Sequence, residues 1–218
     1  LQFDQCYTEG ISKVSAEDVA NAESLGYRIK HLGLTRRTEA GIELRVHPTL
    51  IPEKRLLANV HGVMNAVLVE GNAVGPTLYY GAGAGAEPTA SAVVADLVDI
   101  VRDMGTDQKV RMPSLAFQQD AMSDSPILPM DKVVTAFYMR MTVSEKPGAL
   151  AQITQILGDA GISIEAIRQQ THVSAQVPVI ILTRPVEEGH MNQAIRAIEA
   201  LADVNGEVAR IRVENLDG

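Results

Sequence analysis

The order of predicted elements in residues 133–218 constrains the fold of this chain most strongly. Alternating apolar and polar residues indicate strands, whereas apolar residues three or four positions apart indicate amphipathic helices. The elements predicted in this way are a strand over 137–143, a helix over 150–157, strands over 162–167 and 177–183, a helix over 191–201 and a strand over 208–213. The order βαββαβ is that of the ferredoxin-like fold, in which two helices cover one face of an antiparallel sheet.

Residues 1–102 show a less regular mixture of strands and helices. Ser15 and Asp18 have the spacing of a capping box that opens a short helix, and Gly26 ends it. Ile42, Leu44 and Val46 alternate with polar residues, which predicts a strand that ends at Pro48. A hairpin is predicted over 67–80, and apolar residues at helical spacing predict a helix over 93–101. The fold class is therefore α+β, with a partial mixed α/β domain preceding the βαββαβ domain.

A segment without sustained periodicity separates these two regions. Residues 103–132 are rich in Met, Asp, Ser, Gln and Pro, a composition typical of a linker that packs only locally. The sequence predicts the domain boundaries 1–102, 103–132 and 133–218.

Charge and cysteine content exclude several classes of function. A formal net charge of −8 disfavours binding to nucleic acid or to an anionic membrane, because no surplus of Lys and Arg is present to neutralise phosphates. The single cysteine, Cys6, excludes a disulfide framework and fits a cytoplasmic protein. The five histidines lack the spacing of metal ligands, so no metal site is predicted. No stretch of 18 apolar residues and no secretory signal is present, and Leu1 suggests that the chain begins inside a larger polypeptide.

Two short motifs have both a structural and a functional interpretation. The glycine-rich run 81–85 follows a strand and opens a helix, as in turns that approach a nucleotide phosphate. A complete dinucleotide-binding fold needs a further strand with an acidic residue, which is missing here. The run is thus either a turn that touches a cofactor held by other residues or a purely structural turn. Pro147-Gly148 is likewise either an ordinary strand-to-helix loop or a place where helix-start N–H groups meet a ligand carboxylate.

The residues themselves resemble two known families. The segment 143–153 (VSEKPGALAQI), followed by Gly161-Ile-Ser-Ile164, resembles the signature of the ACT domain, an amino-acid-sensing βαββαβ module. Glu145 stands where the ACT family usually has Asp. The N-terminal region resembles the later half of the catalytic and dimerisation domain of homoserine dehydrogenase, in the segments 7–11, 25–30, 45–48, 65–67 and 80–93.

The resemblance implies which functional residues this chain contains and which it lacks. In the homoserine dehydrogenase family, a nucleotide-binding domain, the substrate-binding Glu and the catalytic Lys all precede the segment 7–11. No catalytic residue is therefore expected here, and neither Glu9 nor Lys30 is assigned that role. The glycine turn matches the segment that returns to the cofactor, NADP or NAD, so Gly83 and Gly85 are the expected cofactor-binding residues.

The resemblance also implies regulation by an amino acid. The expected effector is threonine, bound by Glu145, Gly148, Ala149 and Leu150 in an enzyme of threonine, methionine and isoleucine biosynthesis. A lone ACT sheet leaves its edges and one face exposed, so a homodimer or homotetramer is expected. The full-length enzyme would interconvert L-homoserine and L-aspartate 4-semialdehyde. The alternative is a non-catalytic protein that binds amino acids and dimerises through its ACT domain.

Overall fold

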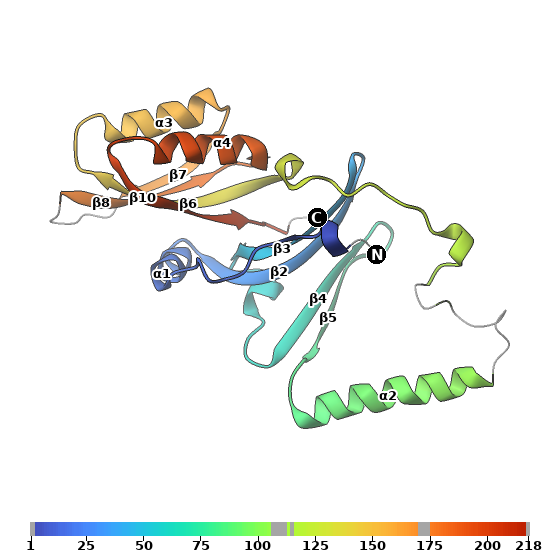
Figure 1. The fold of residues 1–218 in the computed structure, drawn as a ribbon. Helices are drawn as coiled ribbons and strands as arrows, with labels where there is room; N and C mark the ends of the chain where they lie inside the picture. Colours follow the sequence, from blue (N-terminus) through green and yellow to red (C-terminus); the bar gives the residue numbers. More distant parts are fainter. Residues whose placement is uncertain (1–2, 106–112, 114–115, 170–174, 217–218) are drawn as a thin grey trace. The chain divides into compact units, whose positions relative to one another are not determined.

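The βαββαβ order predicted for the C-terminal region is present in the computed structural model, which describes residues 3–105, 113, 116–169 and 175–216. Figure 1 shows helices α3 and α4 on one side of the sheet formed by strands β6, β7, β8 and β10. A two-residue strand, β9, which the sequence did not predict, precedes α4. The elements are β6 (Val134–Ser144), α3 (Ala149–Asp159), β7 (Ile164–Gln169), β8 (Gln176–Thr183), β9 (Val186–Glu187), α4 (Glu188–Glu199) and β10 (Val204–Val213).

The predicted apolar stripes meet in one core beneath the two helices. Alternate residues of β6 and β8 point toward the helices, and the helices return apolar residues at three- and four-residue spacing. Fully buried members include Phe137 and Met139 of β6, Ile153 and Leu157 of α3, and Ile198 of α4.

The N-terminal residues form a second set of elements around a long hairpin. The predicted capping box is confirmed, because Asp18 N donates to Ser15 Oγ at 3.1 Å and Ser15 N donates to Asp18 Oδ2 at 3.1 Å. The helix then ends at Ser24, before Gly26 at φ +80°. The elements are β1 (Tyr7–Thr8), α1 (Ala16–Ser24), β2 (Tyr27–Thr38) and β3 (Gly41–Pro52), with 3-10 turns η1 (Phe3–Gln5) and η2 (Leu56–Asn59).

Strand β3 does not end at Pro48, so that prediction is wrong. It continues to Pro52, with β2 along one side and first β1 and then β10 along the other. Val46 O accepts from Glu9 N on this second side, and Leu50 O accepts from Glu214 N. Pro48, which shares their orientation, lies between the β1 pairs at 45–46 and the β10 pairs at 49–50. Its missing N–H therefore falls in the gap between two partners, where a strand tolerates proline.

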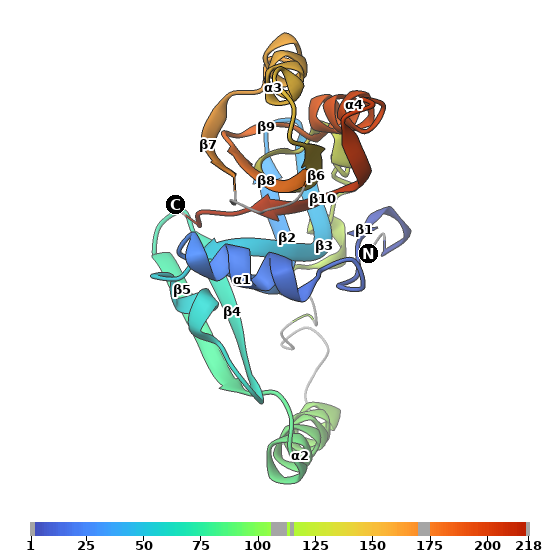
Figure 2. The same cartoon turned by 90° about the vertical axis from the view of Figure 1, so that its left-hand side faces the viewer.

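The pairing of β3 with β10 joins the two sequence regions into one sheet, with the order β1-β3-β10-β6-β8-β7. The face opposite α3 and α4 packs against N-terminal residues. Ala22 and Leu50 lie in one buried cluster with residues of β6, β8 and β10, namely Ala136, Tyr138, Ile180, Leu182, Ile211 and Val213. Figure 2 shows α1 on this side of the sheet, away from α3 and α4.

This arrangement corrects the premise that the ACT sheet leaves both edges and one face exposed. The same chain covers the β10 edge and much of the second face. Spatially, residues 1–58 and 126–217 make one compact unit and residues 59–125 another. The sequence boundaries 1–102, 103–132 and 133–218 therefore do not follow the compact units.

Part of the predicted linker belongs to the first unit. Ile42 N donates to Pro126 O at 2.9 Å, and Leu128 N donates to Ile42 O at 2.8 Å. Gly41 permits this approach, because a Cβ there would lie 2.6 Å from Pro126 O. The segment 126–132, which ends in η4 (Met130–Lys132), thus packs against the start of β3.

The second unit contains the predicted hairpin and helix. Strands β4 (Met64–Gly71) and β5 (Gly75–Ala82) pair antiparallel, helix α2 spans Ala86–Met104, and η3 spans Gln119–Ala121. None of the residues of α2 is buried in the described structure. Its apolar residues are 41–77% exposed: Val93, Val94, Leu97, Val98, Ile100, Val101 and Met104. Within the described residues, no helix is long and apolar enough to cross a membrane.

Candidate functional sites

The first candidate site is a pocket at the end of β6 and the start of α3. It has a volume of about 300 Å³ and is lined by residues from both ends of the strand-to-helix turn and from two neighbouring strands. The lining residues are Val143, Ser144, Glu145, Lys146, Pro147, Ala149, Leu150, Gln169, Val177 and Val179. Three of the four predicted effector residues, Glu145, Ala149 and Leu150, line this pocket.

Gly148, the fourth, precedes the first residue of α3 and has φ +92°. This left-handed conformation favours glycine, because a side chain there adds strain even though an added Cβ would meet no atom within 4 Å. Gln152 N donates to Gly148 O at 3.1 Å, the first amide to donate back along the helix. The amides of Leu150 and Ala151 therefore have no acceptor within the helix, and they lie at its positive end.

The charged groups of the turn complement a zwitterion. Lys146 Nζ is 3.0 Å from Asp203 Oδ1, so this ammonium group is already paired with a carboxylate. The exposed carboxylate of Glu145 lies on the turn itself, and its backbone N–H donates to Ala175 O at 2.9 Å. A carboxylate ligand is suited to the helix start and an ammonium group to Glu145.

The residues on the far wall of this pocket were not predicted from the sequence. Gln169 comes from β7, and Val177 and Val179 come from β8. The register places Val177 opposite Val143, and Val179 opposite both Met141 and Gln169. These residues follow from the strand register, which the periodicity of single strands does not specify.

The second candidate site is the glycine turn between β5 and α2. Gly85 has φ +120° and ψ 152°, a backbone region that is essentially restricted to glycine, and it precedes the first residue of α2. A Cβ at Gly83 would lie 1.4 Å from Asn65 Nδ2, because the Asn65 side chain lies against this glycine. A Cβ at Gly81 would meet nothing within 4 Å. Gly85 is therefore required by its backbone conformation, Gly83 lies against the Asn65 side chain, and Gly81 has neither constraint.

The turn also has the exposure that a ligand contact requires. Residues 81–90 are all exposed, and no side chain caps the start of α2. The first amides of this 19-residue helix therefore lack intrahelical acceptors at an accessible, positive helix end. The geometry fits the phosphate of a nucleotide cofactor, but the backbone conformation of Gly85 requires glycine even when no cofactor is bound.

Glu9 and Lys30 were not assigned a site role from the sequence, and the structure gives their surroundings. Glu9 accepts from Tyr7 Oη at 2.7 Å and from Arg212 Nη1 at 2.9 Å, and these contacts lower its pKa despite the opposing effect of burial. Burial and the neighbouring Arg28 lower the pKa of Lys30. Among the described residues, no group of His, Cys, Asp and Glu could hold a metal ion. His172 lies outside the described residues.

A further pocket of about 350 Å³ lies beside the N-terminal strands. Residues 4–7, 44–45, 127–130 and 133 line it, and none of them was a predicted site residue. It contains the half-buried Cys6 and apolar groups from the segment after Pro126.

Comparisons with known proteins match both regions of the chain. The homoserine dehydrogenase family matches residues 1–98, and the ACT domain family matches residues 137–203. A protein of Pseudomonas aeruginosa named homoserine dehydrogenase is 60% identical over all of this chain and 50% of its own length. One from Neisseria gonorrhoeae is 52% identical over 99% of this chain and 50% of its own length. The chain therefore spans about half the length of these relatives.

Solved structures agree with the sequence matches. A crystal structure of a homoserine dehydrogenase from Thiobacillus denitrificans is 61% identical, with a TM-score of 0.91 over 99% of this chain and 49% of that one. One from S. aureus at pH 7.0 is 25% identical, with a TM-score of 0.64.

Proposed function

Since this chain belongs to the homoserine dehydrogenase family and corresponds to the C-terminal half of its relatives, we propose that it is the C-terminal portion of a working homoserine dehydrogenase. The full-length enzyme would interconvert L-homoserine and L-aspartate 4-semialdehyde in the cytoplasm. The observation that supports this most is the 60% identity over the whole chain. The match of residues 1–98 to a dehydrogenase family disfavours the alternative of a non-catalytic ACT protein.

The chain would contribute to catalysis by positioning rather than by chemistry. A bound nicotinamide cofactor, NAD or NADP, would accept or donate the hydride. The Gly83–Gly85 turn would let the backbone approach that cofactor, and the free amides at the start of α2 would face its phosphates. The exposed apolar face of α2 is suited to packing against the nucleotide-binding domain that precedes this region in the family.

The experiment on activity compares two proteins. Purified full-length enzyme should reduce NAD or NADP in the presence of homoserine, followed by absorbance of the reduced cofactor. The 218-residue chain alone should show no turnover, because the catalytic Lys of the family lies upstream. Turnover by the 218-residue chain at the full-length rate would contradict the assignment, as would a full-length protein with no homoserine-dependent reduction of either cofactor.

The pocket at the end of β6 would bind an amino-acid effector, and threonine is our proposal. Its carboxylate would meet the helix-start amides of Leu150 and Ala151, and its ammonium group would meet Glu145. Calorimetry on the full-length protein at millimolar threonine, with isoleucine and methionine in parallel, tests this. Glu145→Gln should weaken binding, whereas Glu207→Gln, a change at an exposed carboxylate on β10, should not. Absence of heat with all three amino acids would exclude an effector role.

The oligomeric state and domain limits are proposals as well. We assign a homodimer or homotetramer, in which β7, the outer strand of the sheet order, offers an edge for a second copy. The domain boundaries would be 1–102, 103–132 and 133–218. Light scattering of the full-length enzyme measures the oligomer, and a monomeric mass would contradict this proposal.

A further inference from the structure

Residues 1–58 contact the ACT module through backbone, charge and apolar packing at once. The backbone contact is short, with Arg212 paired to Thr49 and Val213 paired to Leu50, followed by a 3.0 Å hydrogen bond from Glu214 N to Leu50 O. Two pairs of a parallel ladder contribute little alone, so side chains must supply most of the attachment.

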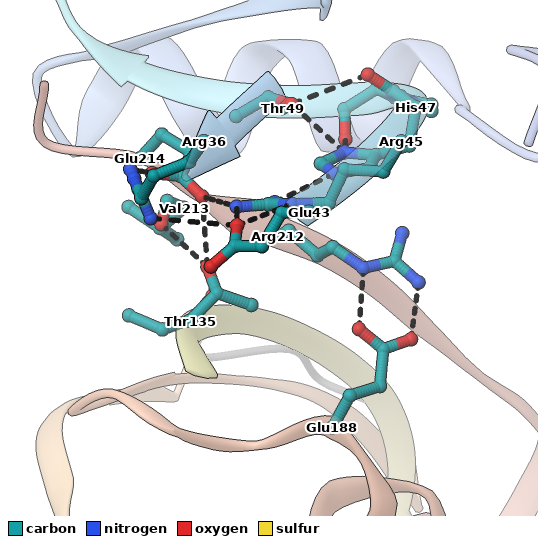
Figure 3. A network of polar contacts seen from close by, with 12 residues as sticks. Arg36, Glu43, Arg45, His47, Thr49, Thr135, Glu188, Arg212, Val213 and Glu214 are labelled. Carbon is teal, nitrogen blue, oxygen red and sulfur yellow. Dashed lines mark hydrogen bonds and ion pairs between the residues drawn. The ribbon is translucent and has the colours of Figure 1, made fainter. Parts of the chain in front are cut away.

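The first side-chain contact is a buried ion cluster around Arg45. The Arg45 side chain is completely buried and donates to Glu43 Oε2 at 2.9 Å and to Glu214 Oε1 at 2.7 Å. Arg36 reaches the other oxygen of Glu214 at 3.3 Å, and Thr135 lies on the far side (Figure 3). Of the two carboxylates that pair with Arg45, Glu43 comes from the N-terminal residues and Glu214 from the C-terminal residues. Without residues 1–58, Glu214 would lose both of these guanidinium partners.

In a second cluster the arginine comes from the C-terminal residues, and one of its carboxylate partners comes from the N-terminal residues. The Arg212 side chain, 1% exposed, belongs to β10 and pairs with Glu188 of α4 within the ACT module. Figure 3 shows its guanidinium facing the Glu188 carboxylate. From the N-terminal residues, Glu9 accepts from Arg212 Nη1 at 2.9 Å, and Tyr7 Oη accepts from Nη2 at 3.0 Å. The guanidinium carbon also lies 4.8 Å from the centre of the Tyr7 ring.

A third cluster fastens α1 to β6. The Asp18 carboxylate, 1% exposed, accepts from Arg140 Nε at 2.7 Å and from Tyr138 Oη at 3.1 Å. Burial raises the pKa of Asp18, but the hydrogen bonds from Arg140 and Ser15 outweigh it, so the pKa is lowered. Asp18 is also the N3 residue of the capping box and accepts from the backbone N–H of the N-cap Ser15, so the same carboxylate holds the helix start and its attachment to the sheet.

These contacts make separation of the two regions costly. It would expose the apolar cluster that Ala22 and Leu50 share with six residues of the ACT sheet, and it would strip partners from buried charges. We propose that residues 1–58 and 126–217 unfold as a single cooperative unit, with residues 1–58 as the built-in partner of the ACT module. A ligand that binds only the folded unit then stabilises all of it, including β3 of the dehydrogenase-matched region.

Hydrogen exchange under increasing urea tests this in the full-length protein. Cooperative unfolding predicts that the slowest amides of β3 and those of β6 and β8 open with the same free energy and the same urea dependence. Glu214→Gln should accelerate exchange about a hundredfold in both segments, because it removes one of the two negative charges beside the buried guanidinium of Arg45. Glu207→Gln, on the exposed part of the same strand, should change neither.

Two outcomes would overturn the proposal. One is opening of β3 in a separate step of lower free energy than β6 and β8; the other is acceleration by Glu214→Gln in one segment alone. Should Glu214→Gln not accumulate as folded protein, Arg36→Gln removes a half-exposed partner of the same carboxylate and should accelerate both segments by a smaller factor.

A ligand experiment extends the test and rests on the proposed effector role. At a threonine concentration of about 100 times its Kd, exchange should slow about a hundredfold in β3 and β6 alike. Slowing restricted to residues 126–217 would contradict the cooperative unit. If calorimetry shows that threonine does not bind, only the proposed effector fails, because the two variants decide cooperativity without a ligand.

Discussion

His47 lies at the centre of the joined sheet and gives the protein a predictable response to acid. Its Nε2 is 2.9 Å from Arg45 Nη1, and its Nδ1 is 3.0 Å from Pro48 O and 3.0 Å from Thr49 Oγ1. A guanidinium can only donate, so Nε2 must accept, and this assigns the proton to Nδ1, which donates to Pro48 O. Burial foremost, and then the charges of Arg212 and Arg45, lower the pKa of His47 to about 3.

The magnitude follows from the difference between the folded and unfolded protein. The imidazole in the unfolded chain takes up a proton near pH 6.5, whereas the folded protein excludes it down to about pH 3. Between these values the unfolded state binds one proton more, so stability falls as the pH falls, by about 1.4 kcal/mol per pH unit. From pH 7.5 to pH 5.0 the expected loss is about 2 kcal/mol. The lowered pKa values of Glu9 and Asp18 act in the same direction but mainly below their ordinary values of 4.5 and 3.8.

Urea-dependent hydrogen exchange of β3, corrected for the intrinsic effect of pH on exchange, measures this loss in the full-length protein. His47→Gln removes the titrating group, so its stability should change with pH by about 1 kcal/mol or less over the same range. His190→Gln, which removes an exposed imidazole of the same unit, should keep the slope of the unaltered protein. The slope rather than the absolute stability is decisive, because His47→Gln also alters packing. An unchanged slope in His47→Gln would refute a buried neutral imidazole.

The remaining predictions concern glycines. Gly83→Ala should displace only the end of the exposed Asn65 side chain, so it should cost no more than about 0.5 kcal/mol in urea unfolding. A raised KM for the cofactor in this variant would assign Gly83 to the cofactor, and an unchanged KM would exclude it. Gly85→Val should raise the KM for the cofactor much more than the KM for homoserine. Gly81→Ala is the control, because a Cβ there meets open space. An unchanged cofactor affinity in folded Gly85→Val would make the turn purely structural. Gly148→Ala should cost about 1–2 kcal/mol because of its φ of +92°, measured by thermal or urea unfolding, and an unchanged stability would contradict that backbone conformation.

Local pattern was sufficient for most of the elements and for part of each site, but it did not predict β2, β9 or the full length of β3. The alternation in β6, the helical spacing in α3 and α4, and the capping box at Ser15 each involve residues within a few positions of one another, and all are present in the structure. The strand-to-helix turn at Gly148 and the glycine turn before α2 are also local, because their backbone conformations are set by residue type. The sequence therefore determined where the two candidate sites begin.

The tertiary structure decided how the regions join, because partners distant in sequence leave no periodic signal. In β3 the usual pattern is inverted: Glu43, Arg45 and His47 are buried, whereas Ile42, Leu44 and Val46 are only half-buried. Polar residues can occupy the covered face there because Arg45 meets Glu214, 169 positions away, and an ion pair compensates for the lost hydration. The same long-range pairing explains why β3 continues through Pro48 and why the far wall of the β6 pocket, from β7 and β8, was not found from the sequence.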